Sequence, residues 1–207
     1  MKKVILTVAA IFAFGFANAQ EVKYGVKAGL NLSTLTGDVE DVKSLAGFHA
    51  GGFVEIKLMD KFAIQPELLY STQGAKSEYS ISEDGFIGRG EEKVKLGYLN
   101  LPVMAKYFVA PGFSIEAGPQ VGFLLSAKNE YDYSVSGFGI TESESGETDI
   151  KDSTESIDFS LNVGAGYEFN QNIFVQARYN FGLTNVAKDT DGSIKNGVVQ
   201  VSIGYKF

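Results

Sequence analysis

The sequence feature that most constrains the fold is a repeated alternation of apolar and polar side chains. Eight segments of about ten residues alternate in this way: 23–31, 48–58, 62–71, 93–107, 113–125, 157–169, 173–184 and 199–207. Successive side chains of a strand point to opposite faces of a sheet, so each segment is predicted to be a β-strand with one apolar and one polar face. No segment repeats with the helical period of 3.6 residues. The pattern therefore predicts an all-β fold.

The connections between these segments are unequal in a regular way. Short links near 59–61, 109–111 and 170–172 follow every second segment, whereas the links near 32–46, 74–92, 126–155 and 185–196 are long and polar. Membrane barrels have short turns at one end and longer loops at the other, and closing the sheet leaves no unpaired backbone in lipid. We therefore expect an eight-stranded antiparallel up-and-down transmembrane β-barrel in the outer membrane of a diderm bacterium. An even number of strands would bring both termini to the periplasmic side.

One segment changes phase along its length. Val94 and Leu96 fall on the opposite face from Leu99 and Leu101. A bulge adds one residue to a strand and shifts the facing of every residue beyond it. We expect a β-bulge near Gly97.

A secreted eight-stranded calyx, which would have an apolar interior, is the alternative to a membrane barrel. The polar face carries too many charges for such an interior: Lys27, Glu55, Glu67, Lys106, Glu116, Asp158, Glu168 and Arg178. Aromatic residues also gather near segment ends, as in the belts of membrane barrels, and the chain ends on Tyr205-Lys206-Phe207. These features favour the membrane barrel.

The charged lumen leads to a further expectation. Opposite charges enclosed by lipid gain from pairing, since an unpaired buried charge is costly. We expect a plugged lumen in which Arg178 bonds to at least one carboxylate from a neighbouring strand. The many glycines on the polar face, among them Gly25, Gly164 and Gly204, argue the other way because they would leave room for water.

The first residues form an export signal. Met1-Lys2-Lys3 is basic, an apolar run extends to Phe16, and Ala17-Asn18-Ala19 fits a signal-peptidase site. We expect residues 1–19 to be a cleaved signal peptide and residues 20–207 to be the outer-membrane β-barrel domain.

Composition excludes several functions. The net charge of −7 opposes nucleic-acid binding, and the absence of cysteine excludes thiol catalysis and cysteine-ligated metals. The single histidine, His49, is interpreted as a hydrogen-bonded interior residue. We therefore assign no catalytic, cofactor-binding or metal-binding residue and expect no cofactor and no enzymatic activity.

The segment 126–155 is unusually acidic. It contains only two basic residues, Lys128 and Lys151, and eight acidic ones: Glu130, Asp132, Glu142, Glu144, Glu147, Asp149, Asp152 and Glu155. Two interpretations are open: a solvated, mobile loop, which we favour because the acids lack a ligand spacing, or a site for bridging cations or a basic partner.

Several motifs resemble those of the PorT-type small outer-membrane β-barrels, within the wider OmpA- and OmpX-like group. They are Gln65-Pro66-Glu67-Leu68-Leu69-Tyr70, Tyr98-Leu99-Asn100-Leu101-Pro102-Val103, Gly118-Pro119-Gln120-Val121-Gly122, Lys106-Tyr107, Arg178-Tyr179 and the terminal Tyr205-Lys206-Phe207. The resemblance covers nearly all of the mature chain and offers no catalytic residue. Its terminal aromatic implies the barrel-assembly machinery as a partner during biogenesis.

The expected function is a structural or surface-interaction role for a monomeric barrel in contact with outer-membrane lipid and lipopolysaccharide. A small transport pore or an accessory component of a secretion system is the first alternative. A barrel-embedded enzyme acting on lipid is the second.

Overall fold

The computed structural model describes residues 21–39, 41–83, 86–138, 140–188 and 192–207. The predicted signal peptide, residues 1–19, lies outside the described residues. Within the described ranges, no helix has the length and apolar character needed to cross a membrane.

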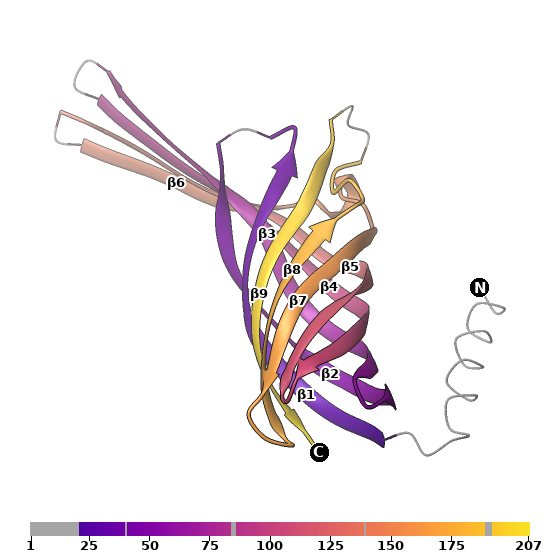
Figure 1. The fold of residues 1–207 in the computed structure, drawn as a ribbon. Helices are drawn as coiled ribbons and strands as arrows, with labels where there is room; N and C mark the ends of the chain where they lie inside the picture. Colours follow the sequence, from indigo (N-terminus) through magenta and orange to yellow (C-terminus); the bar gives the residue numbers. More distant parts are fainter. Residues whose placement is uncertain (1–20, 40, 84–85, 139, 189–191) are drawn as a thin grey trace.

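The described chain is almost entirely strand (Figure 1). In chain order the elements are β1 (Glu21–Gly37), β2 (Val42–Met59), β3 (Phe62–Glu83), β4 (Phe86–Ala110), β5 (Phe113–Gly137), β6 (Ile140–Asp149), the single-turn 3-10 helix η1 (Lys151–Ser153), β7 (Ile157–Glu168), β8 (Ile173–Gly182) and β9 (Ile194–Lys206).

Eight of these strands close into a ring of antiparallel pairs. The sheet runs β4-β3-β2-β1-β9-β8-β7-β5, and the pairing of β4 with β5 closes it. This confirms the predicted eight-stranded antiparallel barrel. The ninth described strand, β6, pairs with β5 alone and lies outside the ring. The short links also lie where they were predicted, between β2 and β3, β4 and β5, and β7 and β8.

The prediction of long loops at 74–92 and 126–155 was wrong. β3, β4 and β5 continue past the ring and, with β6, form a four-stranded antiparallel extension made of residues 76–83, 86–95, 128–137 and 140–149, here called the projecting sheet (Figure 1). The first link is also shorter than predicted, because β1 reaches Gly37 and β2 begins at Val42. Both faces of the projecting sheet are exposed to solvent. Short alternating runs, Tyr79 and Ile81 on β3 and Tyr131, Tyr133 and Val135 on β5, lie within the segments that were predicted to be loops.

A bulge lies beside Gly97, but it is on β5 and not on the predicted segment. Gly97 faces Ser126 and Tyr98 faces Leu124, so Leu125 is the extra residue. Leu96 and Tyr98, two residues apart on β4, both point inward and are buried, so β4 does not change phase. Val94 and Leu96 are apolar because they pack in an apolar cluster inside the barrel.

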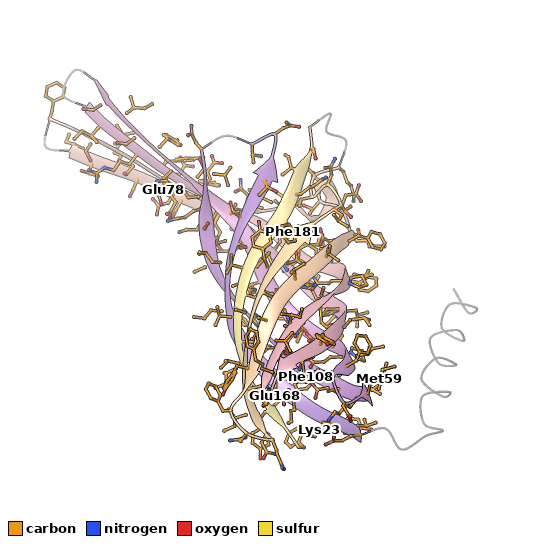
Figure 2. The ribbon with its side chains drawn as sticks, in the orientation of Figure 1. Lys23, Met59, Glu78, Phe108, Glu168 and Phe181 are labelled. Atoms are coloured by element: carbon orange, nitrogen blue, oxygen red, sulfur yellow. The ribbon has the colours of Figure 1, made fainter. Side chains whose placement is uncertain are left out.

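Side chains project from both faces of the wall (Figure 2), and the two faces have opposite chemistry. On β7, Leu161 and Val163 are 43% and 45% exposed, whereas Asn162 between them is fully buried. The same alternation continues around the ring, so apolar side chains face outward and polar ones fill the lumen. This arrangement is that of a membrane barrel and excludes the calyx, whose interior would be apolar.

Aromatic side chains form two belts on the outer wall. One lies near the short turns and includes Tyr107, Phe113, Tyr167, Phe169 and Tyr205, and the other lies toward the opposite end and includes Phe48, Tyr70, Phe123, Phe159 and Phe181. On β5 the apolar band runs from Phe113 to Phe123, which matches the length of a tilted membrane-spanning strand.

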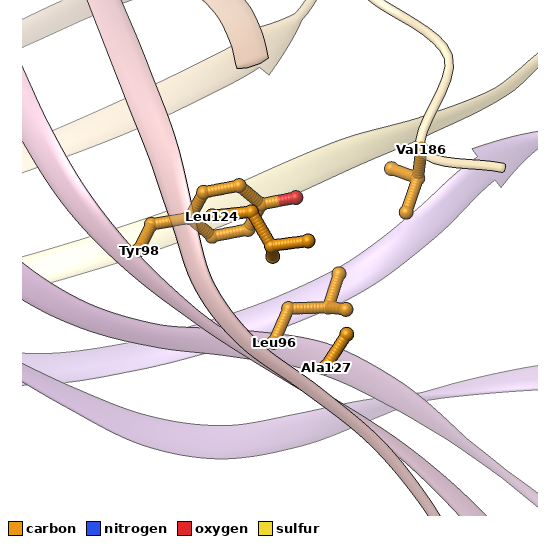
Figure 3. Packing of buried hydrophobic residues seen from close by; sticks show 5 residues of the cluster. All are labelled: Leu96, Tyr98, Leu124, Ala127 and Val186. Carbon is orange, nitrogen blue, oxygen red and sulfur yellow. The ribbon is translucent and has the colours of Figure 1, made fainter. Parts of the chain in front are cut away.

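A small apolar core lies inside the barrel at the end opposite the short turns (Figure 3). Leu96, Tyr98, Leu124, Ala127 and Val186 pack together, and each is at most 6% exposed. Four of them come from β4 and β5, and Val186 comes from the segment that joins β8 to β9. This cluster covers the polar lumen from above.

Candidate functional site

The lumen contains a network of ion pairs that begins near the short turns. The carboxylate of Glu55 on β2 lies 2.6 Å from the ammonium groups of both Lys106 on β4 and Lys206 on β9. Lys206 also lies 2.6 Å from Glu168 on β7. Both lysines lie within 6 Å of the Phe174 ring centre, an arrangement that adds a cation–π attraction. These ion pairs connect β2, β4, β7 and β9 across the lumen near the short turns.

A second group of charges lies deeper in the lumen. Arg178 on β8 donates two hydrogen bonds to Glu67 on β3, at 2.7 and 2.9 Å, and a third to Glu116 on β5. The ammonium of Lys27 on β1 lies 2.7 Å from Glu67. Gln65 joins the two groups, because it accepts from Lys106 at 3.2 Å and donates to Glu67 at 2.7 Å.

The expected bonding of Arg178 to a carboxylate is confirmed, but the expected source of that carboxylate was wrong. The strands adjacent to β8 place Gly164 and Gln200 opposite Arg178. The guanidinium therefore reaches across the lumen to strands that are not its hydrogen-bonded neighbours. Glycine at position 164 makes this possible, because a Cβ there would lie 2.7 Å from the Arg178 side chain.

The glycines of the inner wall also have a different effect from the one expected. A Cβ on Gly25 would lie 2.2 Å from the Phe53 ring, and one on Gly204 would lie 2.2 Å from the Phe174 ring. The two rings contact each other edge to face at 5.3 Å. The space left by these glycines is filled by aromatic side chains.

His49 is a buried interior residue, as expected. Its Nδ1 lies 2.7 Å from the Asn31 side-chain oxygen and its Nε2 lies 2.7 Å from the Ser202 hydroxyl. A serine, a histidine and an amide in this order resemble a catalytic triad. All three side chains are at most 3% exposed, however, so the Ser202 hydroxyl has no access from solvent or from the bilayer. Sequence reasoning did not identify Ser202 because 153 residues separate it from His49.

The projecting sheet is a second candidate site, and its two faces differ. One face carries the rings of Tyr79, Tyr133 and Tyr131, with ring centres 6.1 and 5.4 Å apart. Tyr133 donates a hydrogen bond to Glu92, and this bond raises the pKa of Tyr133 to about 12.

The other face carries a ladder of exposed ion pairs. Glu78 accepts hydrogen bonds from Lys43 and Lys76, which lower its pKa to about 2. The acids Glu130 and Glu147 pair with Lys95 and Lys128, respectively. Residues 126–155 are therefore strand and 3-10 helix over most of their length rather than a mobile loop, although their acids are solvated as expected.

The outer edge of the projecting sheet is the backbone of β6. Glu142 and Glu144 on this strand form no ion pair with any residue of the described ranges, and both are exposed. The edge is therefore unpaired and carries uncompensated negative charge.

The ring of eight strands, its apolar outer band and its charged lumen define the class of the protein, and the family comparison agrees. Residues 16–188 match the family model described as an outer membrane protein beta-barrel domain. The chain belongs to this family. Membership places the protein among the small β-barrels of the outer membrane. No curated protein matches the chain.

Several solved structures are similar to the chain at low sequence identity. The Neisserial surface protein A is 13% identical, with a TM-score of 0.52, over 90% of this chain and 99% of its own. Ail, the attachment invasion locus protein of Yersinia pestis, is 15% identical, with a TM-score of 0.48, over 90% and 99% of the two chains. OprG of Pseudomonas aeruginosa is 11% identical, with a TM-score of 0.45, over 91% and 97%.

Proposed function

We propose that this protein is a non-enzymatic surface-interaction protein whose barrel holds the projecting sheet outside the cell. The observation that carries this proposal is the projecting sheet, which continues the barrel wall beyond the ring. Its edge strand, β6, has no partner among the described strands on its outer side. The ion pairs of the lumen connect strands across the barrel and stiffen the base from which the sheet extends. Short turns and both termini then lie on the periplasmic side.

The chemistry of the edge indicates the partner. Unpaired edge strands bind extended peptides by adding a strand, and main-chain hydrogen bonds supply much of the affinity. On β6 the unpaired Glu142 and Glu144 would repel a second copy of the same acidic strand. We therefore propose that the partner presents an extended basic segment.

Peptide binding to the refolded protein tests this function. A fluorescent ten-residue peptide of alternating lysine and threonine should bind, and its binding should protect the amides of 140–149 from hydrogen exchange. The double variant E142Q/E144Q should bind at least fivefold more weakly. The matched control E91Q/D132N removes two charges from the central strands and should keep its affinity. Equal binding of an alternating glutamate–threonine peptide, or unchanged exchange along β6, contradicts the proposal.

A narrower family assignment is part of the same proposal. The motif that resembles PorT-type barrels contributes Gln65 and Glu67, two members of the lumen network. If the protein belongs to the PorT-type barrels, that membership would support the alternative function, an accessory role in a secretion system. Crosslinking on the surface of intact cells distinguishes the two roles: capture of secretion components through the barrel wall favours the accessory role, whereas capture through β6 favours the surface role.

A further inference from the structure

The barrel wall is interrupted between β2 and β3. Their register shifts between Ser44 and His49, so that residues 45–48 have no regular partners on β3. Side chains replace the missing ladder: the Asn31 amide donates to the carbonyls of Phe48 and Thr72, and the Phe48 N–H donates to the Thr72 hydroxyl. A cavity of about 350 Å³ lies at this irregularity of the wall.

The cavity lies where the outer wall changes from apolar to charged. Phe48 and Tyr70, whose rings are 5.9 Å apart, belong to the aromatic belt farther from the short turns. They line the side of the cavity that faces the apolar band. On β4 the outward residues change from Leu99 through Gly97 to Lys95. This is the level at which lipid headgroups meet the apolar band of a membrane barrel.

Gly97 allows polar side chains of the two neighbouring strands to come close together at this level. A Cβ on Gly97 would lie 2.5 Å from the Ser126 hydroxyl and 3.2 Å from the Tyr70 hydroxyl, so the polar groups of two neighbouring strands face the same space. Together with Thr72, which also lines the cavity, they place three hydroxyl groups between the apolar floor and the charged rim.

Two lysines form the rim. Lys95 and Lys128 lie directly opposite each other in the register of β4 and β5, and among the residues that the structure describes they are the only charged side chains that line the cavity. Like charges in facing positions destabilise a sheet. Each lysine has one carboxylate partner, Glu130 or Glu147, but these pairs are exposed, and exposed pairs contribute little. An anion held between the two ammonium groups would relieve their repulsion.

We propose that this cavity binds a phosphorylated glycolipid of the outer leaflet, of the lipid A class. The phosphate lies between Lys95 and Lys128 and accepts a hydrogen bond from the hydroxyl of Ser126, since the Thr72 hydroxyl already donates to the Phe48 carbonyl. An acyl chain lies along Phe48 and Tyr70 on the outer wall. A water-soluble phosphate would use the lysines but gain nothing from this apolar floor, whereas a lipid occupies both parts.

Lipid titration of the refolded protein in zwitterionic micelles, followed by native mass spectrometry, tests the site. Lipid A should bind with one-to-one stoichiometry, and K95Q/K128Q should weaken binding at least tenfold. The matched control is K76Q/K93Q, because Lys76 and Lys93 also face each other across a strand pair on the same face but do not line the cavity. That control should retain the affinity of the parent protein.

Three ligands complete the test. Lipid A without its phosphates and inorganic phosphate should each bind at least tenfold more weakly than lipid A, and phosphatidylglycerol should bind more weakly as well. Equal weakening by the two lysine pairs would overturn the site, since it would reflect total charge alone. Equal binding of inorganic phosphate or of phosphatidylglycerol would overturn the glycolipid assignment. The heat-dependent gel migration of each variant shows that it has folded.

Discussion

At the scale of single residues, charge pairing determines how this barrel fills its interior. Glu67 illustrates the principle, because its carboxylate receives hydrogen bonds from Arg178 and an ion pair from Lys27 while it is only 4% exposed. Burying such groups costs desolvation energy, so the network is not a strong source of net stability. Removing one member is a different matter: without the Glu67 carboxylate, Lys27 is charged and buried without an ion pair to any described residue, and Arg178 keeps only Glu116.

Glu67→Gln should therefore destabilise the barrel by about 3–5 kcal/mol, the cost of breaking a buried ion pair. Urea titration followed by heat-dependent gel migration measures this change, which suits a chain without tryptophan. Removing the second charge as well, in K27M/E67Q, should recover part of the loss. Glu142→Gln on the exposed β6 serves as the control, and an equal effect there would contradict the argument.

The outer wall responds differently to a charge. Leu161 faces outward within the apolar band of β7, so Leu161→Arg should cost about 2–4 kcal/mol if it lies near the bilayer midplane. Tyr167→Arg, on the same face but in the belt near the short turns, should cost about 0–1 kcal/mol. Unfolding in lipid vesicles gives both values. Similar costs at the two positions would show that the apolar band is misplaced.

At the scale of elements, the barrel and the projecting sheet have separate sources of stability. The barrel is closed by lumen ion pairs and by the β4–β5 ladder from Tyr98 to Ala110. The projecting sheet depends on its own ladders, its ring contacts and its exposed ion pairs. The two parts meet at the bulge beside Gly97.

The barrel should therefore fold without the tips of the sheet. Ser77 faces Glu92 and Glu130 faces Glu147 in register, so residues 78–91 and 131–146 can each be replaced by an Asn-Gly turn. The urea midpoint of the barrel should change by less than the equivalent of about 0.5 kcal/mol, as for surface substitutions. Loss of the heat-dependent gel shift in the truncated protein would show that the sheet is required for closure.

Phe207 follows β9 and bonds to the neighbouring strand β1. The Phe207 N–H donates to the Tyr24 carbonyl at 2.8 Å, and its ring packs on Tyr205 at 5.4 Å. Deleting Phe207 should leave unfolded, protease-sensitive protein in the periplasm, whereas Phe207→Tyr should assemble normally because it keeps the aromatic ring. Membrane fractionation of both variants measures this, and normal assembly of the deletion would refute a role for the terminal aromatic.

At the scale of the whole molecule, eight strands enclose a lumen that side chains can fill. Here the ion-pair network and the aromatic rings of Phe53 and Phe174 occupy it, and the apolar cluster around Tyr98 covers it at the far end. Pairing leaves few free charges along the axis to attract ions. These features favour a rigid support over a pore.

The refolded mature protein should accordingly show no steady conductance in a planar bilayer. The R178M/E67Q variant, which removes the central pair, provides a comparison with less charge in the lumen and should also remain closed, because Phe53 and Phe174 are unchanged. Stepwise currents from the unmodified monomer would instead support the transport alternative.

The sequence by itself determined the strands of the wall, their facing and the number that closes the ring. A two-residue period arises when one face of a strand lies in a polar environment and the other in an apolar one. Lumen residues such as Lys27 and Glu116 could therefore be assigned without a structure. Val94 and Leu96 break the alternation of β4 because they pack in the apolar cluster inside the barrel, and the bulge at this level is on β5. The short turns were visible because they interrupt that period.

Only the tertiary structure decided which lumen residues meet and how far the sheet extends. Arg178 reaches Glu67 from 111 residues away because curvature brings non-adjacent strands within a side chain's length, and pairing at that distance leaves no local pattern. The extent of the projecting sheet depends on the pairing of four strands, because the alternating runs within it are short and both of its faces are exposed. The register shift between β2 and β3 likewise appears only in the structure, where the side chains of Asn31 and Thr72 bond across it.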